Sequence, residues 1–97
     1  MIDGLVTGPI NKNNIQNNDF NFKGHTDFLD SCFNGQALMF MVSSEIKIAL
    51  LTEHIPIDKV VGEITTELIQ TRIKLVESSL KNDFNINKPK IAVLSIN

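Results

Sequence analysis

The chain has 97 residues, of which 42% are hydrophobic and 21% charged, and its formal net charge is −2. This length allows at most one small domain, and this composition argues against disorder. The nine basic residues form no run, which excludes an electrostatic surface for nucleic acid. No stretch approaches the ~20 apolar residues that span a bilayer, and a basic signal-peptide start is missing.

The single cysteine, Cys32, cannot form an internal disulfide and suits a reducing cytoplasm. It lies four residues after Phe28, on the apolar face of a short predicted helix. We therefore expect a buried small side chain rather than a nucleophile.

Lys12 follows a predicted strand and a tight turn. The apolar residues 2–6 predict the strand, and a Gly-Pro break comes next, in the run Thr7-Gly8-Pro9-Ile10-Asn11-Lys12. A strand, a turn and a lysine are compatible with an anion-binding corner, although the spaced glycines and the Gly-Lys-Ser/Thr ending of a phosphate loop are missing. A solvated loop lysine is the alternative.

The next motif predicts a short amphipathic helix behind a glycine, in the run Phe22-Lys23-Gly24-His25-Thr26-Asp27-Phe28-Leu29. Thr26 is the expected N-cap, and Asp27 lies in the first turn, where negative charge is favourable. Asn34-Gly35 is the expected end of the helix. His25 would then lie just outside the helix N-terminus.

Residues 37–42 and 46–51 are apolar and predict an antiparallel hairpin. His54 follows the second strand, in the run Thr52-Glu53-His54-Ile55-Pro56. Because Pro56 keeps the preceding residue extended, we expect the chain to leave the sheet without entering a helix.

One long helix is predicted from Thr66 to about Asn82, with Thr65 as its N-cap. Apolar residues recur along one face at helical spacing, and they are Leu68, Ile69, Ile73, Val76 and Leu80. Four charged residues read as the solvated face, and they are Arg72, Lys74, Glu77 and Lys81. Residues 91–96 predict a last strand. Since both ends of the chain are apolar and strand-like, we expect a segment of a longer protein.

His25 and His54 are the two histidines of the chain, and each lies where a helix starts or a strand ends. Ligand-binding groups collect at such junctions in α/β proteins, so the pair suggests a metal site. Such a site needs at least a third protein ligand, and two ordinary surface histidines are the alternative.

Three of these motifs together resemble 4-hydroxythreonine-4-phosphate dehydrogenase in their order and spacing. They are Val6-Thr7-Gly8-Pro9-Ile10-Asn11-Lys12, Phe22-Lys23-Gly24-His25-Thr26-Asp27-Phe28-Leu29 and Thr52-Glu53-His54-Ile55-Pro56. The long helix and the run Pro89-Lys90-Ile91-Ala92-Val93-Leu94-Ser95-Ile96-Asn97 continue the resemblance. It covers essentially the whole chain, but only about the central third of a full-length member.

The resemblance implies an α/β fold of the isocitrate/isopropylmalate-dehydrogenase kind, with a mixed sheet and flanking helices. Residues 1–97 would form a single partial domain, the central segment of a two-domain dehydrogenase. The implied activity is the NAD-dependent oxidation of 4-(phosphooxy)-L-threonine with decarboxylation, in vitamin B6 biosynthesis. Members of the family are cytoplasmic homodimers.

The resemblance also implies a divalent metal (zinc, magnesium or cobalt) held by three histidines at the dimer interface. Two of them map onto His25 and His54, and the third belongs to an Asn-Pro-His-Ala-Gly segment that would begin at Asn97. A cation at the substrate hydroxyl would act as a Lewis acid. Lys12 lies in a motif near the active site, which implies a substrate-binding role. Asp27 either orients His25 or charges the helix start.

The chain also departs from the family pattern. A Gly-rich dinucleotide turn is missing, and the family's cofactor-binding and phosphate-binding residues lie largely outside this stretch. We therefore expect the isolated chain to be inactive. Two alternatives stay open: a related dehydrogenase for a phospho-threonate or phospho-erythronate, and a non-catalytic remnant or interaction module.

Overall fold

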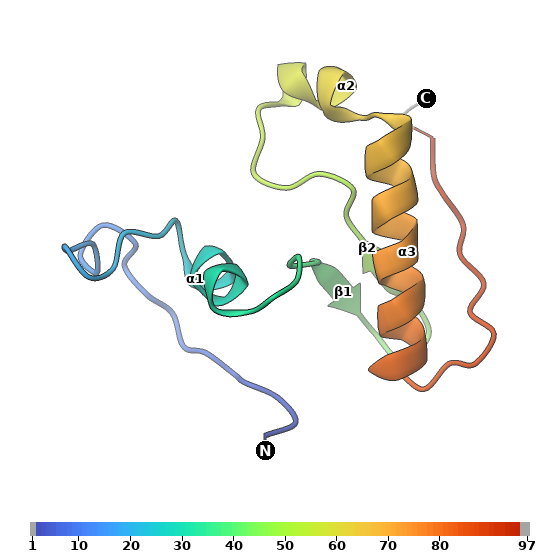
Figure 1. Ribbon diagram of the computed structural model, residues 1–97, viewed down its shortest axis with the longest axis horizontal. Helices are drawn as coiled ribbons and strands as arrows, with labels where there is room; N and C mark the ends of the chain where they lie inside the picture. Colours follow the sequence, from blue (N-terminus) through green and yellow to red (C-terminus); the bar gives the residue numbers. More distant parts are fainter. Residues whose placement is uncertain (1, 96–97) are drawn as a thin grey trace. The chain divides into compact units, whose positions relative to one another are not determined.

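The computed structural model describes residues 2–95, which form a short helix, a two-stranded hairpin, two short helical turns and one long helix (Figure 1). These elements belong to two units, residues 1–37 and residues 38–97. The expected small α/β arrangement of helices and a sheet is therefore present, with the strands and the long helix in the second unit.

Asparagine side chains shape the loop of the first unit that precedes helix α1 (His25–Cys32). Asn11 Oδ1 accepts hydrogen bonds from two backbone N–H groups, each at 3.1 Å. Asn17 Oδ1 accepts two more, each at 2.8 Å. An asparagine amide that bonds to nearby backbone competes with helix and strand formation, so this segment forms turns.

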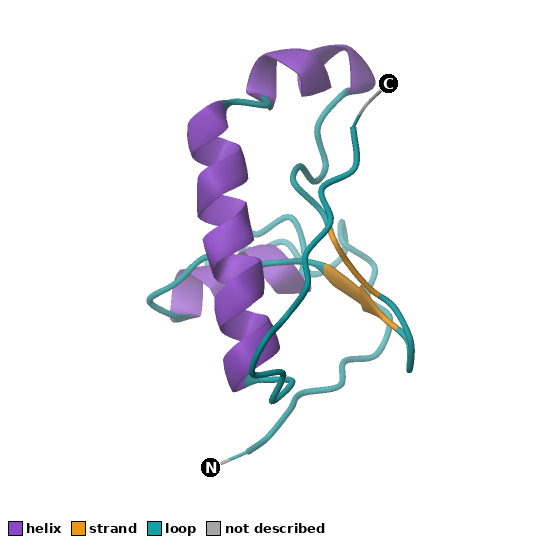
Figure 2. Cartoon of the chain, turned by 90° about the vertical axis from the view of Figure 1, so that its right-hand side faces the viewer, coloured by secondary structure: helices purple, strands orange, loops and turns teal. Residues whose placement is uncertain are grey.

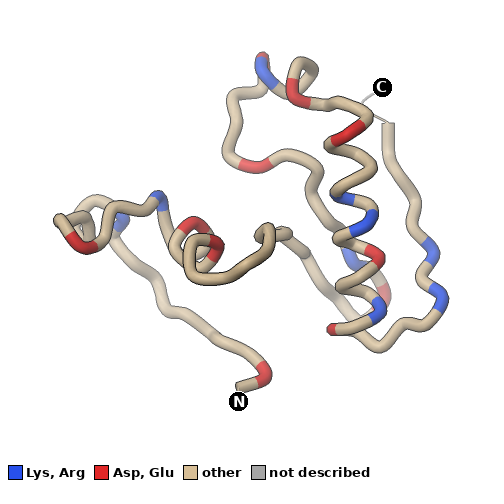
Figure 3. The backbone as a smooth tube through the Cα atoms, viewed as in Figure 1, with Lys and Arg blue, Asp and Glu red and all other residues tan. Residues whose placement is uncertain are grey.

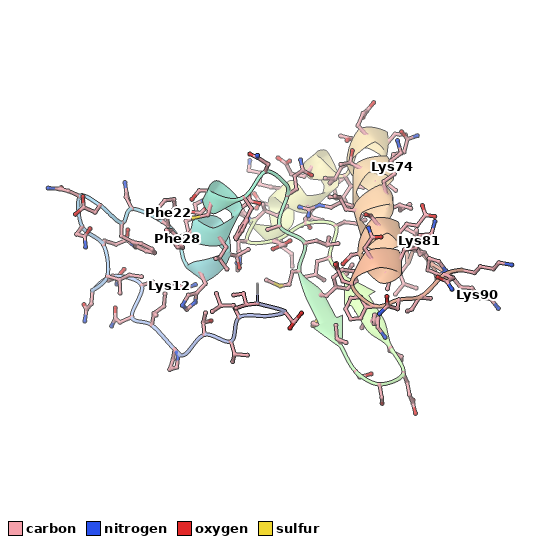
Figure 4. All side chains as sticks on the ribbon, turned by 60° about the horizontal axis from the view of Figure 1, so that its bottom comes forward. Lys12, Phe22, Phe28, Lys74, Lys81 and Lys90 are labelled. Atoms are coloured by element: carbon pink, nitrogen blue, oxygen red, sulfur yellow. The ribbon has the colours of Figure 1, made fainter. Side chains whose placement is uncertain are left out.

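Three phenylalanines hold this loop against α1. The ring centroids of Phe20 and Phe22 lie 5.1 Å apart, and both lie 5.3 Å from the centroid of Phe28. Figure 4 shows Phe22 next to Phe28 on α1. Each such ring pair contributes about 0.5–1.5 kcal/mol beyond the area that it buries.

The expected boundaries of α1 are wrong at both ends. Gly24, rather than Thr26, occupies the N-cap position, and His25 is the first residue of the helix instead of lying outside it. The helix starts early because Phe28 N–H already donates to the Gly24 carbonyl, at 3.1 Å. At the other end the helix stops at Cys32, because Phe33 has an extended backbone, so the Asn34-Gly35 end is wrong.

Cys32 is exposed, and its predicted burial is therefore wrong. It occupies the last position of α1. The aromatic cluster forms at Phe28, one turn earlier, and leaves the end of the helix uncovered. Phe33, the next residue, is 70% exposed as well.

The second unit begins with an antiparallel hairpin of β1 (Phe40–Val42) and β2 (Lys47–Ala49), in which Met41 pairs with Ile48. The hairpin is confirmed, although its strands are shorter than predicted. The turn is closed by Ser43, whose N–H donates to the Ile46 carbonyl at 2.8 Å and whose Oγ accepts from Ile46 N–H at 3.0 Å. A serine hydroxyl thus replaces the favoured Asn-Gly turn.

The predicted strands at residues 2–6 and 91–96 are wrong wherever the structure describes them. Residues 2–6 and 91–95 are not part of any ladder, and residue 96 lies outside the described residues. Both segments have the composition of strands, but a strand also requires a hydrogen-bonded neighbour. The described part of the chain pairs neither segment with another strand.

The chain enters a helix directly after Pro56, contrary to the prediction. A 3₁₀ turn, η1 (Ile57–Lys59), is followed at once by α2 (Val60–Glu63). Pro56 has φ −58°, and a proline is tolerated where a helix starts because its missing N–H would have no partner there.

The long helix α3 (Thr66–Asn82) has the predicted bounds and dominates the second unit (Figure 2). Thr65 is its N-cap, and the side chain accepts a hydrogen bond from Leu68 N–H at 3.1 Å. Four members of the predicted apolar stripe are half-buried, and Leu80 is buried. After α3 the chain turns back and runs in the opposite direction (Figure 1).

An aromatic contact joins the end of α3 to the hairpin. The ring centroids of Phe84 and Phe40 lie 5.7 Å apart, and Lys47 Nζ lies 5.2 Å from the Phe84 centroid. The face of β1 and β2 that carries Phe40 and Lys47 is therefore the face that packs. Among residues 2–95, no helix combines the length and the apolar character needed to cross a membrane.

Candidate functional site

Lys12 lies at the start of α1, next to the backbone that carries His25. A Cβ added to Gly24 would lie 3.5 Å from Lys12 Cε and 3.9 Å from Lys12 Nζ. Figure 4 shows Lys12 reaching toward α1. The first unit thus brings together Lys12 and the Gly24-His25 corner, which are twelve and thirteen residues apart in the sequence.

Gln16 joins the two segments that meet at this corner, and the sequence pattern did not single it out. Its Nε2 donates to the carbonyl oxygen of Lys12 and to that of Phe22, each at 2.8 Å. A glutamine four residues after Lys12 in an asparagine-rich loop looks like one more polar loop residue. Only the folded loop shows that its amide joins two segments.

Asp27 binds the backbone that leads into the helix. Its Oδ2 accepts a hydrogen bond from Lys23 N–H at 2.9 Å. The donor is the residue before the N-cap Gly24, so the bond lies one residue earlier than the reciprocal bond of a capping box. This contact gives Asp27 a role at the helix start, and its orientation of His25 stays a prediction.

His25 is half-buried at the first position of α1. The backbone N–H groups of the first turn have no helical partner, which makes this end of a helix favourable for negative charge. His25 and the Lys12 ammonium therefore lie at the same end of α1.

His54 belongs to the second unit, in the connection between β2 and η1. Its side chain is exposed, and its backbone has φ 54°, in the left-handed region. A non-glycine residue in this region is uncommon and carries a conformational cost, and such residues concentrate at functional sites. The sequence did not predict this conformation.

A half-buried ion pair holds the turn before His54 against α3. Arg72 Nη1 lies 3.9 Å from Glu53 Oε1, and the two side chains are 19% and 14% exposed. The prediction that Arg72 belongs to a solvated face is therefore wrong, because its guanidinium faces Glu53. Elsewhere on α3 acidic and basic residues alternate along the helix, as Figure 3 shows.

The side chains of His25 and His54 are suitable metal ligands. Their assembly into one site stays a prediction. Imidazole nitrogens are ligands of zinc and similar borderline ions. His25 and His54 lie in different units. Across residues 2–95, no three His, Cys, Asp or Glu side chains group closely enough to hold an ion. Asn97, where the motif of the third histidine would begin, lies outside the described residues.

Comparison with known proteins identifies the family. The family model described as pyridoxal phosphate biosynthetic protein PdxA matches residues 1–97. The chain belongs to the PdxA family. This match confirms the family that the three motifs indicated.

Proteins similar to this chain carry the name 4-hydroxythreonine-4-phosphate dehydrogenase. The protein from Bacteroides thetaiotaomicron is 43% identical over 99 residues, which cover 100% of this chain and 27% of that protein. The protein from Sulfurihydrogenibium sp. is 38% identical, with 98% of this chain and 30% of that protein covered. A protein from Neisseria meningitidis is 34% identical, with coverages of 100% and 31%.

The chain thus spans less than a third of the length of these PdxA relatives. No solved structure matches it. The family assignment therefore rests on sequence similarity.

Proposed function

We propose that this chain contributes metal- and substrate-binding residues to a dehydrogenase that oxidises 4-(phosphooxy)-L-threonine, with decarboxylation, in vitamin B6 biosynthesis. The observation that carries the proposal is the match over the whole chain to relatives named 4-hydroxythreonine-4-phosphate dehydrogenase. The proposal includes NAD as cofactor, a homodimer, and a partial domain of an isocitrate/isopropylmalate-dehydrogenase-like fold.

His25 and His54 are the proposed metal ligands. His25 is held by the first turn of α1, and His54 by a left-handed turn after β2. A divalent metal at these imidazoles would supply Lewis-acid polarisation of the substrate hydroxyl, and NAD would supply the hydride acceptor. The chain's own part is to present two imidazoles, with the remaining ligand supplied from elsewhere.

Lys12 is the proposed partner of an anionic group of the substrate. Its ammonium lies at the start of α1, where the unpaired N–H groups of the helix also favour negative charge. The substrate carries a phosphate and a carboxylate, and either group suits this corner. Lys12 would therefore orient the substrate without entering the bond changes.

Metal binding tests the proposal most directly. In the catalytically competent protein that carries this chain, we expect His25→Ala and His54→Ala each to lower zinc affinity about 100-fold, since even outer-sphere partners of a metal contribute 10–100-fold. Isothermal titration with Zn²⁺ measures the affinity. Cys32→Ser is the matched control, because Cys32 has an exposed thiol to which zinc can bind non-specifically.

The same variants separate the proposal from a non-catalytic module. In such a module both histidines are loop residues, so zinc would not raise the melting temperature and neither histidine variant would differ from wild type. A zinc affinity that falls with Cys32→Ser and not with the histidine variants would contradict the proposed ligands.

Two activity assays test whether the isolated chain is active and which substrate the competent protein prefers. We expect the isolated 97-residue chain to reduce no NAD with 4-(phosphooxy)-L-threonine, and turnover would contradict that expectation. The competent protein should prefer this substrate over phospho-threonate and phospho-erythronate in kcat/KM. The reverse order would assign it to a related dehydrogenase of the same fold.

A further inference from the structure

One glutamine joins the two segments of the first unit that carry proposed site residues. The side-chain amide of Gln16 has two N–H donors, and both acceptors, the carbonyl oxygens of Lys12 and Phe22, lie 2.8 Å away. The first acceptor belongs to the Lys12 loop. The second lies two residues before Gly24, on the segment that leads into α1.

The two backbone–backbone bonds that follow Lys12 directly are long. The Ile15 N–H to Asn11 carbonyl bond measures 3.3 Å, and the Gln16 N–H to Asn13 carbonyl bond measures 3.4 Å. Both are longer than a typical N–H···O bond of about 2.9–3.0 Å. The two bonds from the Gln16 side chain are shorter. One stays within the loop, at Lys12, and the other reaches Phe22 in the segment before α1.

The Lys12 side chain extends toward the segment that this link holds. Lys12 Cε would lie 3.5 Å from a Cβ on Gly24, an ordinary van der Waals contact, so the lysine runs across the glycine. An exposed lysine has several rotatable bonds and loses conformational entropy when it is held in one place. Fixing its backbone relative to Gly24 reduces the number of positions that the ammonium can reach.

We propose that Gln16 is a positioning residue that holds the Lys12 ammonium at the start of α1, where it binds the anionic group of the substrate. The proposal rests on the proposed function for its second half, the binding of substrate. Its first half, the placement of Lys12, concerns the chain alone and is measured without substrate.

The placement is tested by nuclear Overhauser contacts in the 97-residue chain. The wild-type chain should show a contact between the Lys12 Hε and Gly24 Hα protons, and Gln16→Ala should lose it. Asn17→Ala is the matched control, because Asn17 also makes two side-chain bonds of 2.8 Å in the same loop and does not bond to Lys12. The control should keep the contact.

Gln16→Glu is a second variant, which keeps the test valid if Gln16→Ala fails to fold. The side chain keeps its size, but an ionised carboxylate has no N–H to donate and would face two carbonyl oxygens. Circular dichroism at 222 nm checks that the helices remain. A contact that persists in both folded Gln16 variants, that is lost equally in Asn17→Ala, or that is missing in the wild type would overturn the positioning role.

Kinetics of the competent protein test the second half of the proposal, the binding of substrate by Lys12. Gln16→Ala should raise KM for the phosphorylated substrate about tenfold with zinc affinity unchanged, because a misplaced binding group weakens substrate binding. Combined with Lys12→Ala, it should add no further loss, since the two residues act as a unit. Loss of the Lys12–Gly24 contact with an unchanged KM would contradict the substrate role of Lys12, and hence the proposed function, while the positioning of Lys12 would stand.

Discussion

His54 combines a proposed ligand with an unfavourable backbone conformation. It has φ 54°, and Asn85, with φ 55°, is the other non-glycine residue in the described part of the chain with a positive φ. Asparagine tolerates this region well, because its short amide bonds locally. A histidine there is held by its surroundings, namely the Glu53–Arg72 ion pair on one side and the helical turn that starts after Pro56 on the other.

At this residue we predict that stability and metal binding respond differently to the choice between glycine and alanine. His54→Gly should be about 1 kcal/mol more stable than His54→Ala, because glycine adopts a positive φ without steric cost. Both variants should lose zinc affinity, since both lack the imidazole. Urea denaturation measures the first effect and calorimetric titration the second.

Asn85 is the control for the backbone effect, because it has nearly the same positive φ as His54 and is not a proposed ligand. Asn85→Gly should likewise be more stable than Asn85→Ala, with zinc affinity unchanged in both. If His54→Gly were no more stable than His54→Ala while the Asn85 pair behaved as expected, the left-handed conformation of His54 would be wrong.

At the scale of elements, the elements that the sequence predicted best are those closed by local bonds. Helix α3 has its predicted bounds because Thr65 caps it through a bond to Leu68, three residues away, and its apolar stripe repeats at helical spacing. The hairpin formed where it was predicted because Ser43 closes a four-residue turn. Both signals lie within a few residues of sequence.

The cap of α3 can be tested by substitution. Thr65→Ala removes the side-chain acceptor of Leu68 N–H and should lower the free energy of unfolding by about 1 kcal/mol. Thr66→Ala is the matched control. Thr66 is exposed at the first helical position, and alanine has the higher helix propensity, so stability should stay unchanged or rise slightly.

Thermal and urea unfolding followed at 222 nm measure both variants. Equal losses in Thr65→Ala and Thr66→Ala would show that the threonine pair matters for some reason other than the cap. The helix would then start elsewhere than at Thr66.

At the scale of the whole molecule, the described residues bury little apolar surface. Leu80, 7% exposed, is the one buried residue among them. Large apolar side chains are exposed on the hairpin, among them Met41, Val42 and Ile48. Because burial of apolar area is the main source of folding free energy, local bonds alone leave a chain marginally stable.

We therefore predict a shallow unfolding transition for the 97-residue chain. Its urea m-value should fall below about 1 kcal/mol/M, the lower end for small proteins, because m scales with the surface exposed on unfolding. Circular dichroism against urea concentration measures it. A steep transition with an m-value well above this limit would mean that the chain buries far more surface than the described residues do.

In the candidate site, local motifs identified the residues, whereas a contact between two segments became visible only in the structure. His25, His54, Lys12 and Asp27 were all named from motifs, and the family that those motifs indicate is confirmed. The approach of Lys12 to Gly24 was not predicted, since it depends on a side chain, Gln16, that bonds to two separate backbone segments. Motifs identify residue types, but a contact between loops depends on how both loops fold.

The sequence by itself determined the family, the long helix with its cap, the hairpin and the residue types available for metal and anion binding. These features depend on spacing, capping and turn chemistry within a few positions. Tertiary structure alone decided that residues 2–6 and 91–95 have no strand partners, that Cys32 is exposed, that Arg72 faces Glu53, and that Gln16 holds the Lys12 loop. Strand pairing, burial and side-chain bridges require a second segment, and the composition of the first segment does not specify where that second segment lies.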